Sequence, residues 1–210
     1  MKLTILGATG GVGRHLVAHA LADGHEVTAA VRTPQRVTAR DDRLTVLQVD
    51  PLDASSLEPA VAGADAVLSG IGAAGRRDPL KPASTSAKAA ARAMTATGVR
   101  RIVAVSAGPL NREGTGQPVF ARVLSPLLWA VLREVYTDLE AMERCLRGSG
   151  LDWTAVRPPA LLDKPGQGRY RSEVGGGPNR SSIARADVAR AMLDMVDRPD
   201  TVQQAVGVSR

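Results

Sequence analysis

A glycine-rich turn near the start of the chain carries the most specific chemical signal in the sequence. The segment Gly7–Gly13 (GATGGVG) separates a short apolar run from a stretch with helical spacing. Glycines at such a place permit a tight turn, a close approach of backbone to a pyrophosphate, and close packing of helix on strand. The helix that follows offers free N–H groups and the positive end of its dipole to phosphate. We predict that this turn binds a dinucleotide through Gly7, Thr9, Gly10, Gly11, Val12 and Gly13.

Two arginines stand about twenty residues further on, where dinucleotide-binding folds discriminate between NAD and NADP. An NAD site usually has an acidic residue there, which accepts a hydrogen bond from the ribose 2′-hydroxyl. This chain has Arg32 and Arg36 instead, with no carboxylate in the segment 27–36. Guanidinium groups suit the 2′-phosphate, so we predict NADP(H) as the cofactor. The alternative is that both arginines are only surface cations.

Further candidate residues directly follow the apolar runs that predict strands. The carboxyl ends of parallel strands meet at one edge of a sheet, where cofactors bind. We expect Asp50 beside the adenine, and Gly70-Ile71-Gly72 where the backbone passes close to the cofactor. Ser106 is the candidate catalytic residue, because its hydroxyl would hydrogen-bond the nicotinamide or the acceptor. Pro158 follows the next strand and is expected near the nicotinamide.

The tyrosine–lysine pair that dehydrogenases use as a proton donor is missing from the sequence. A lysine four residues after the tyrosine lowers the pKa of the phenol, which can then exchange protons at neutral pH. Here Glu140 follows Tyr136 at that spacing, and Val174 follows Tyr170. Alcohol dehydrogenase and epimerase chemistry are therefore disfavoured. Direct hydride transfer to a flavin or quinone needs orientation more than a strong acid, and it stays compatible with the sequence.

Other polar residues have ordinary explanations. His15, His19 and Asp23 are spaced four apart and would share a helix face, which is one requirement of a metal site. An exposed polar stripe opposite the apolar face explains the same spacing, and we predict no metal. Cys145 is the single cysteine, so neither an internal disulfide nor a thiolate cluster is expected.

Two features of the sequence that we expect near the bound acceptor can each be interpreted in more than one way. Arg157 could meet an anionic substrate, or it could form an ion pair with Asp152 or Asp163. The apolar residues in the stretch 119–135 could form a lid over the nicotinamide, part of a dimer surface, or ordinary core, which is the default. This stretch, together with Leu161, is expected to hold the ring of the acceptor.

The elements that position these residues follow from the spacing of apolar side chains. Strands that alternate with helices imply right-handed crossovers and a parallel sheet. The fold predicted is a single Rossmann-type, doubly wound α/β domain with a mostly parallel sheet and helices on both faces. The segment 158–182 is rich in Pro and Gly and is expected as a surface excursion over the active face. We expect strands at 2–6, 26–31, 44–49, 65–69, 101–105, 152–156 and 205–208, and helices at 12–22, 55–61, 84–97, 187–196 and ending near 147.

Composition and charge narrow the class of protein. A chain of 210 residues with 44% hydrophobic and 23% charged residues suits one domain over residues 1–210 and excludes disorder. No stretch has the length of a membrane span and the N-terminus lacks a secretory layout, so we expect a cytoplasmic protein. The net charge of +6 comes with arginines scattered along the whole chain. We therefore expect no specific nucleic-acid binding.

Taken together, these motifs resemble the atypical short-chain dehydrogenase/reductase superfamily. The branch is its small NAD(P)H-binding group, with flavin reductase/biliverdin-IXβ reductase-like and NmrA-like members. The resemblance covers nearly the whole chain, and its last long motif, SGLDWTAVRPP at 149–159, is specific to this branch. The motifs that carry it are GATGGVG at 7–13, VR at 31–32, Asp50, VSA at 105–107, SGLDWTAVRPP at 149–159, and the late helix after ADV at 186–188.

This resemblance implies roles for several residues. Arg32 and Arg36 match arginines that bind the 2′-phosphate, and Ser106 matches a serine beside the nicotinamide. The segment 158–161 matches one near the nicotinamide and the substrate. The flavin reductase has a histidine where this chain has Ala160, so reduction of a simple acceptor fits better than tetrapyrrole reduction.

Two functions from different classes follow. The first is an NADPH-dependent reductase that passes hydride to a small-molecule acceptor such as a flavin, quinone or similar planar compound. The second is an NmrA-like redox sensor that binds NADP(H) without turnover and signals through a protein partner. The missing tyrosine–lysine pair fits both, and they differ in whether NADPH is consumed.

Overall fold

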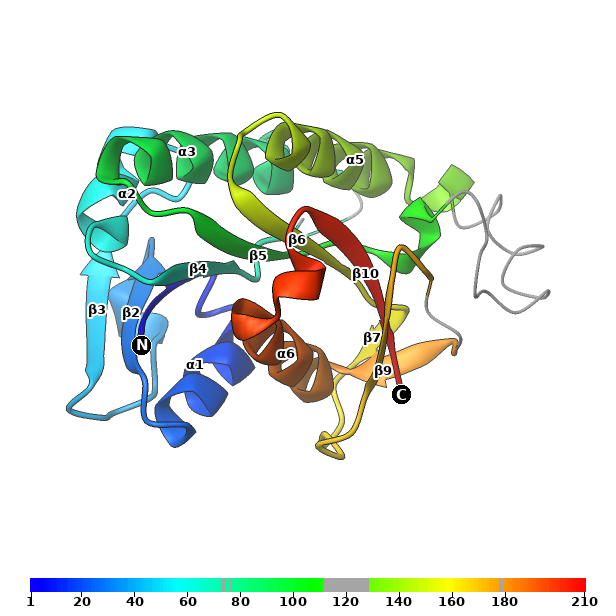
Figure 1. Cartoon of the computed structure of the whole chain (residues 1–210), viewed down its shortest axis with the longest axis horizontal. Coiled ribbons are helices and arrows are strands. Elements are labelled where there is room, and N and C mark those ends of the chain that lie inside the picture. Colours follow the sequence, from blue (N-terminus) through cyan, green and yellow to red (C-terminus); the bar gives the residue numbers. More distant parts are fainter. Residues whose placement is uncertain (73–74, 76, 112–128, 178–179) are drawn as a thin grey trace.

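The centre of the molecule is a single eight-stranded sheet, as the computed structural model in Figure 1 shows. The structure describes residues 1–72, 75, 77–111, 129–177 and 180–210. Strand order is β3-β2-β1-β4-β5-β6-β10-β8, and every neighbouring pair is parallel except β10 and β8. The strands are β1 Lys2–Leu6, β2 Glu26–Val31, β3 Leu44–Gln48, β4 Ala66–Ser69, β5 Arg101–Val105, β6 Asp152–Arg157, β8 Arg171–Val174 and β10 Gln204–Ser209.

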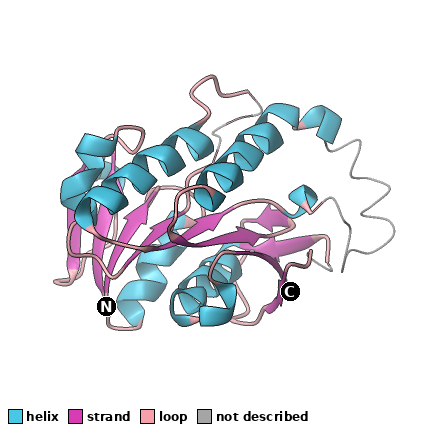
Figure 2. Cartoon of the chain, turned by 45° about the horizontal axis from the view of Figure 1, so that its top comes forward, coloured by secondary structure: helices cyan, strands magenta, loops and turns pink. Residues whose placement is uncertain are grey.

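Helices cover both faces of this sheet, which confirms the predicted Rossmann-type, doubly wound α/β fold (Figure 2). Two hydrophobic clusters result, one between the sheet and each layer of helices. Strands β1, β4, β5 and β6 read as apolar runs because both of their faces are buried. One layer holds α1 Gly13–Ala22 and α6 Arg185–Asp194, and the other holds α2 Ala54–Val61, α3 Pro82–Thr97 and α5 Arg133–Arg147.

The Pro- and Gly-rich segment 158–182 contains more regular structure than the sequence predicts. It forms β7 Ala160–Leu162, which pairs in parallel with β9 Ser182–Ala184 in a separate two-stranded sheet. It also supplies β8, which extends the main sheet antiparallel to β10. Three short strands between glycines and prolines give no periodic signal, which is why the excursion was expected to be irregular.

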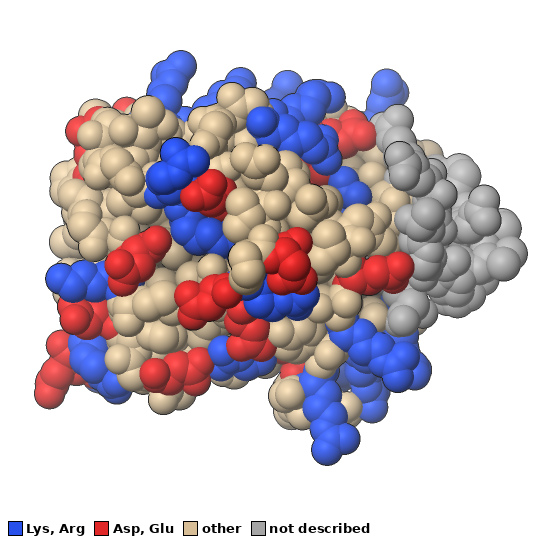
Figure 3. Space-filling view, in the orientation of Figure 1, with Lys and Arg blue, Asp and Glu red and all other residues tan. Residues whose placement is uncertain are grey.

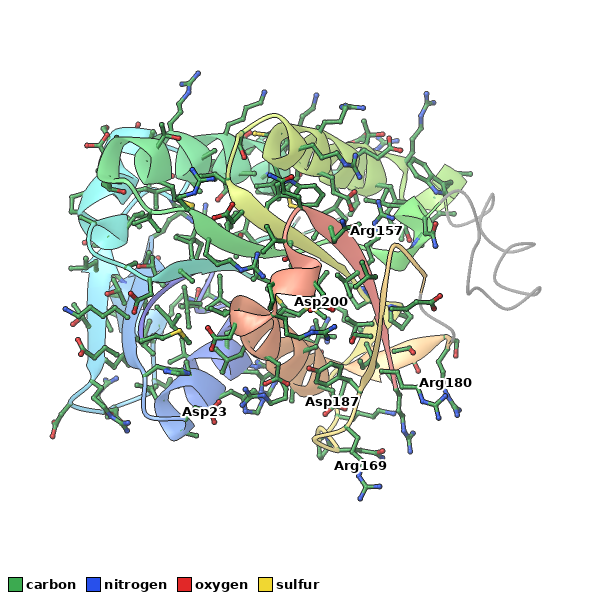
Figure 4. The ribbon with its side chains drawn as sticks, viewed as in Figure 1. Asp23, Arg157, Arg169, Arg180, Asp187 and Asp200 are labelled. Atoms are coloured by element: carbon green, nitrogen blue, oxygen red, sulfur yellow. The ribbon has the colours of Figure 1, made fainter. Side chains whose placement is uncertain are left out.

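A buried carboxylate on α6 ties this segment to the rest of the fold. Asp187 is 3% exposed, and Figure 4 labels it on α6. Its Oδ1 accepts hydrogen bonds from the backbone N–H of Gln167 at 2.8 Å and of Gly168 at 2.9 Å. These bonds hold the turn between β7 and β8 against the helix that begins after β9.

The caps of two helices differ from the sequence expectation. α2 begins at Ala54, and the side chain of Asp53 accepts a hydrogen bond from the N–H of Ser56 at 3.1 Å. α3 begins at Pro82, and its N-terminus is capped from another helix. Asp138 of α5 accepts from the N–H groups of Ala83 and Ser84, both at 3.0 Å. Pro82 at the first position explains the early start, since its missing N–H needs no partner.

The surface has no single sign of charge on the face that Figure 3 shows, where basic and acidic side chains are interspersed. This pattern agrees with arginines spread along the chain. Within the part of the chain that the structure describes, no helix is both long and apolar enough to cross a membrane.

We expect the Asp138→Ala variant to lose about 1–3 kcal/mol of unfolding free energy. The substitution leaves two buried N–H groups of α3 without an acceptor, which is the cost of a lost cap and of unsatisfied donors. Urea unfolding followed by circular dichroism measures the change. Thr137→Ala, at the neighbouring exposed position of α5, is the control. Equal stability of the two variants would show that the cap contributes nothing.

Candidate functional site

A cleft of about 580 Å³ opens where β1, β2, β4 and β5 end, at the carboxyl edge of the sheet. This is the edge at which doubly wound sheets bind ligands, because the chain leaves neighbouring strands toward opposite faces there. Most of the residues singled out in the sequence meet in its lining. They are Gly7, Thr9, Gly10, Gly11, Val12, Arg32, Arg36, Gly70, Ile71, Gly72 and Ser106.

The glycine turn is packed too tightly for side chains. Gly7 has φ +72°, and its carbonyl accepts a hydrogen bond from the N–H of Gly10 at 2.8 Å. A Cβ on Gly13 would lie 2.0 Å from that same carbonyl oxygen. A Cβ on Gly70, after β4, would lie 3.1 Å from the backbone nitrogen of Gly13. Gly13 is outside the cleft lining, and it lets the first turn of α1 sit directly against the loop.

Cations gather at the end of the cleft near this turn. Arg32 follows β2 and Arg36 closes the short 3-10 turn Pro34–Arg36; both are exposed and line the cleft. Arg185, the first residue of α6, also lines it. Its side chain lies over Gly11, since a Cβ there would be 2.6 Å from the Arg185 Nε. The charge and the free N–H groups at this end suit a phosphate-bearing ligand.

The guanidinium of Arg185 is held in place by a neighbouring carboxylate. Asp163, in the segment after β7, lies 2.7 Å from one of its nitrogens and 3.1 Å from a nitrogen of Arg14. Asp163 is largely exposed, so this pairing orients Arg185 more than it stabilises the fold.

Ser106 is buried at the floor of the cleft and belongs to a polar network under it. Its hydroxyl donates a hydrogen bond of 2.7 Å to Oε1 of Glu143 on α5. Arg157, at the end of β6, donates to both oxygens of Glu143, from Nε at 2.9 Å and from Nη2 at 2.6 Å. Arg147 adds a bond of 2.9 Å to Oε2. Figure 4 labels Arg157, which lies on the sheet beneath α5.

This network corrects the expectation for Arg157. Its acidic partner is Glu143, whereas Asp152 pairs with Arg100 and Asp163 pairs with Arg14 and Arg185. The guanidinium of Arg157 is thus committed to an internal carboxylate, and it is absent from the residues that line the cleft.

The opposite end of the cleft is mainly apolar. Leu80, Val135, Leu139 and Leu161 line it next to Ser106 and Ile71. Of the stretch 119–135, residues 119–128 lie outside the described part of the chain. In the described part, Trp129, Leu132 and Val135 pack against the core on the α3–α5 face, as the default expectation has it, whereas Val131 is exposed.

Besides Gly13, two predicted site residues are not in the cleft lining. Asp50 is exposed, and its Oδ1 accepts a hydrogen bond from the N–H of Leu52 at 3.0 Å, within the turn after β3. Pro51 and Leu52 line the cleft in its place. Pro158 is buried, and its carbonyl accepts a 2.7 Å bond from the N–H of Gly108, which joins the loops after β5 and β6.

Neither tyrosine lies among the described residues that line the cleft. Tyr136 is 6% exposed, stacks at 5.2 Å on Trp129, and has its pKa raised by burial. The hydroxyl of Tyr170 donates to Asp194 at 2.7 Å, and burial followed by this carboxylate raises its pKa strongly. The structure therefore provides no tyrosine proton donor from these two positions.

The histidine stripe of α1 packs partly against α6, so it is less exposed than expected. His19 Nε2 lies 3.1 Å from the carbonyl oxygen of Ala186, and Asp23 pairs with Arg190 at 2.6 Å. His15 is half-buried, and burial first, then nearby Arg14, lowers its pKa. Among the described residues no group of three His, Cys, Asp or Glu side chains is arranged to hold a metal ion.

The sequence matches the NAD(P)H-binding family over residues 7–199, and the chain belongs to this family. It is 27% identical to the uncharacterized sugar epimerase YhfK of Bacillus subtilis, over 98% of this chain and 92% of that protein. It is 33% identical to a (4-alkanoyl-5-oxo-2,5-dihydrofuran-3-yl)methyl phosphate reductase of Streptomyces griseus. That match covers 76% of this chain but only 48% of the reductase.

Solved structures share the fold over the full chain. A short-chain dehydrogenase/reductase of Veillonella parvula in complex with NADP has a TM-score of 0.82 at 22% identity, covering 100% of this chain and 94% of that one. A putative NADH-flavin reductase of Streptococcus pneumoniae has a TM-score of 0.80 at 22% identity, covering 99% and 98%. These neighbours show that the chain shares their Rossmann-type fold.

Several cleft residues carry no sequence signal that identifies them beforehand. Glu143 and Asp138 are two of several acidic residues on α5, and only the packing of that helix brings Asp138 to the cleft and Glu143 to the Ser106 hydroxyl beneath it. Arg185 immediately precedes the Ala186-Asp187-Val188 motif, so its place at the start of the last helix was a usable clue. Its contact with the glycine turn depends on the packing of α6 beside α1.

We expect Gly13→Ala to weaken binding of both NADPH and NADH at least tenfold. The new methyl group cannot occupy the space beside the Gly7 carbonyl, so α1 must move away from the turn that receives the phosphates. Fluorescence titration with each dinucleotide measures the effect. Gly148→Ala, at the end of α5, is the control because its Cβ meets only ordinary contacts at 3.6 Å. Unchanged affinities for Gly13→Ala would contradict a phosphate-binding turn.

Proposed function

We propose that this protein is an NADPH-dependent reductase that passes hydride to a flavin, quinone or similar planar acceptor. One observation carries the proposal: a single cleft joins the glycine turn and three arginines at one end to Ser106 and apolar side chains at the other. A ligand with several phosphates and an attached ring that reacts beside Ser106 matches this order of groups.

The residues at the cationic end fit NADP(H). The glycine turn would receive the pyrophosphate, because its glycines carry no side chains of their own and it leads directly into the N-terminus of α1. Arg32 and Arg36 would bind the 2′-phosphate, and neither has an acidic neighbour in the loop 32–37 to compete for it. Arg185, over Gly11, would reach the pyrophosphate itself.

The residues at the apolar end would orient an acceptor ring. The cofactor supplies the hydride, and NADPH becomes NADP⁺ as the acceptor gains two electrons and one proton. The side chains of Leu80, Val135, Leu139 and Leu161 would hold a planar ring against the nicotinamide and exclude water. Any second proton that the product takes up comes from water, so the missing tyrosine–lysine pair is no obstacle.

We expect substitutions of Arg32 and of Arg185 to change the affinities for NADPH and NADH in different ways. Arg32→Ala should weaken NADPH binding about tenfold or more while leaving NADH binding nearly unchanged, because only NADPH has the 2′-phosphate. Arg185→Ala should weaken both dinucleotides by similar factors, because both contain the pyrophosphate. Isothermal titration of each variant with each cofactor separates the two cases. Equal affinity of the wild-type protein for NADPH and NADH would refute the assignment of Arg32.

Turnover itself is tested by the decay of NADPH absorbance. We expect saturable oxidation with FMN, riboflavin or a small quinone, faster with NADPH than with NADH, and none above background without an acceptor. A reaction without protein controls for uncatalysed reduction, and Gly13→Ala should turn over more slowly than wild type at NADPH concentrations that do not saturate it. Protein that binds NADPH but oxidises it with none of these acceptors would contradict the reductase. It would favour the redox sensor, whose partner binding should then differ between NADPH and NADP⁺.

A further inference from the structure

The network under Ser106 fixes which way the serine hydroxyl can act. We propose that Glu143 is a positioning residue that holds the Ser106 proton away from the cleft, so that Ser106 accepts a hydrogen bond from the carboxamide N–H of the nicotinamide. The inference rests on the proposed function for the placement of the nicotinamide ring. It adds the direction of the bond and the residues that set it.

Glu143 acts only as a hydrogen-bond acceptor. Three N–H groups of two guanidinium side chains, those of Arg157 and Arg147, donate to its two oxygens. Glu143 is 2% exposed and Arg157 is 9% exposed, so water does not compete with the two bonds from Arg157. A carboxyl group so surrounded carries no proton to donate, and its remaining capacity is for one more donor.

Ser106 is that donor. Its hydroxyl has a single proton and two lone pairs, and the proton is used at 2.7 Å on Oε1 of Glu143. Its backbone N–H is also used, in a 2.7 Å bond to the carbonyl of Val156. What Ser106 presents to the cleft it lines is therefore lone pairs of Oγ. A ligand that pairs with this oxygen has to bring an N–H or O–H group.

Asp138 is a second buried carboxylate near Ser106, and both of its oxygens also accept hydrogen bonds from within the protein. Asp138 accepts the N–H groups of Ala83 and Ser84 through its two oxygens. Asp138 also lines the cleft, but these two bonds hold its oxygens at the start of α3. Of the groups that a nicotinamide ring carries, the carboxamide is the one that has both an N–H donor and a carbonyl. Only the N–H side of that group suits the lone pairs of Ser106.

The direction of this bond is tested with a cofactor analogue whose ring group has no N–H. In the 3-acetylpyridine analogue of NADP⁺ a methyl ketone replaces the carboxamide, so the carbonyl stays and the donor is lost. Equilibrium dissociation constants are measured by quenching of tryptophan fluorescence, with no turnover involved. We expect wild-type protein to bind NADP⁺ about five- to tenfold more tightly than the analogue. In Ser106→Ala the ratio should fall to about one.

A double variant tests whether Glu143 sets the direction. Glu143→Met with Arg157→Met replaces the buried ion pair by apolar side chains of similar length, an exchange that proteins often accept without loss of stability. Ser106 remains, but its proton loses its acceptor and can turn toward the cleft. The ratio of the two dissociation constants should then fall to about one as well. Glu134→Gln, at an exposed glutamate of the same helix, should keep the wild-type ratio.

The outcomes separate this inference from the proposed function. If the wild-type protein binds NADP⁺ and the analogue equally tightly, Ser106 does not accept a hydrogen bond from the carboxamide. Oxidation of NADPH by a flavin or quinone can still be observed in the same protein. If the double variant still binds NADP⁺ more tightly than the analogue by the wild-type factor, and Ser106→Ala does not, then only the role of Glu143 is overturned. Loss of the ratio in both variants, with the Glu134→Gln control unchanged, supports the inference even in a protein that never turns over.

Discussion

The contact on which the rest of the molecule depends is the one between the Gly7 carbonyl and the start of α1. No side chain fits there, because a Cβ on Gly13 would lie 2.0 Å from that oxygen. The close contact aims the first N–H groups of α1 at the space between β1 and β4, and Gly70 packs against it from the β4 side. The cleft exists at this point because α1, after β1, and α3, after β4, leave the carboxyl edge toward opposite faces of the sheet.

A second constraint is the ion pair between Glu143 and Arg157, which is buried between α5 and the sheet. Removing two charges from water costs several kcal/mol, and such a pair is retained only where its hydrogen bonds are complete. Here every contact is short, and Arg147 and Ser106 supply the remaining donors. The pair therefore gives α5 a defined register against β6. The same register places Val135, Asp138 and Leu139 at the cleft.

From the sequence it could be predicted that the glycine turn and Arg32 come together, but not the network beneath Ser106, and the reason is physical. The glycine turn and Arg32 follow β1 and β2 directly, so strand order alone brings them together. Glu143 meets Arg157 only through the packing of a helix on a strand, and proximity in sequence wrongly suggested Asp152 or Asp163. The strands of the segment 158–182 were missed because each has only three or four residues and the segment between them is rich in glycine and proline. Asp50 was expected in the cleft by the strand-end rule, but its own turn uses the carboxylate.

The division between the two ends explains how one fold accommodates relatives named as an epimerase and as reductases. In the proposed function, backbone geometry and a few arginines would bind the dinucleotide, and these depend on the sheet, which the relatives share. The acceptor end is built from α5, β7 and the start of α3, whose side chains can change without disturbing the sheet. In this chain the carboxylates there, Asp78 and Asp138, already accept backbone N–H groups, Asp78 from Leu80 at 3.2 Å. The surface left for a ligand at that end is largely apolar, and a flat ring is the shape of ligand that such a surface holds best.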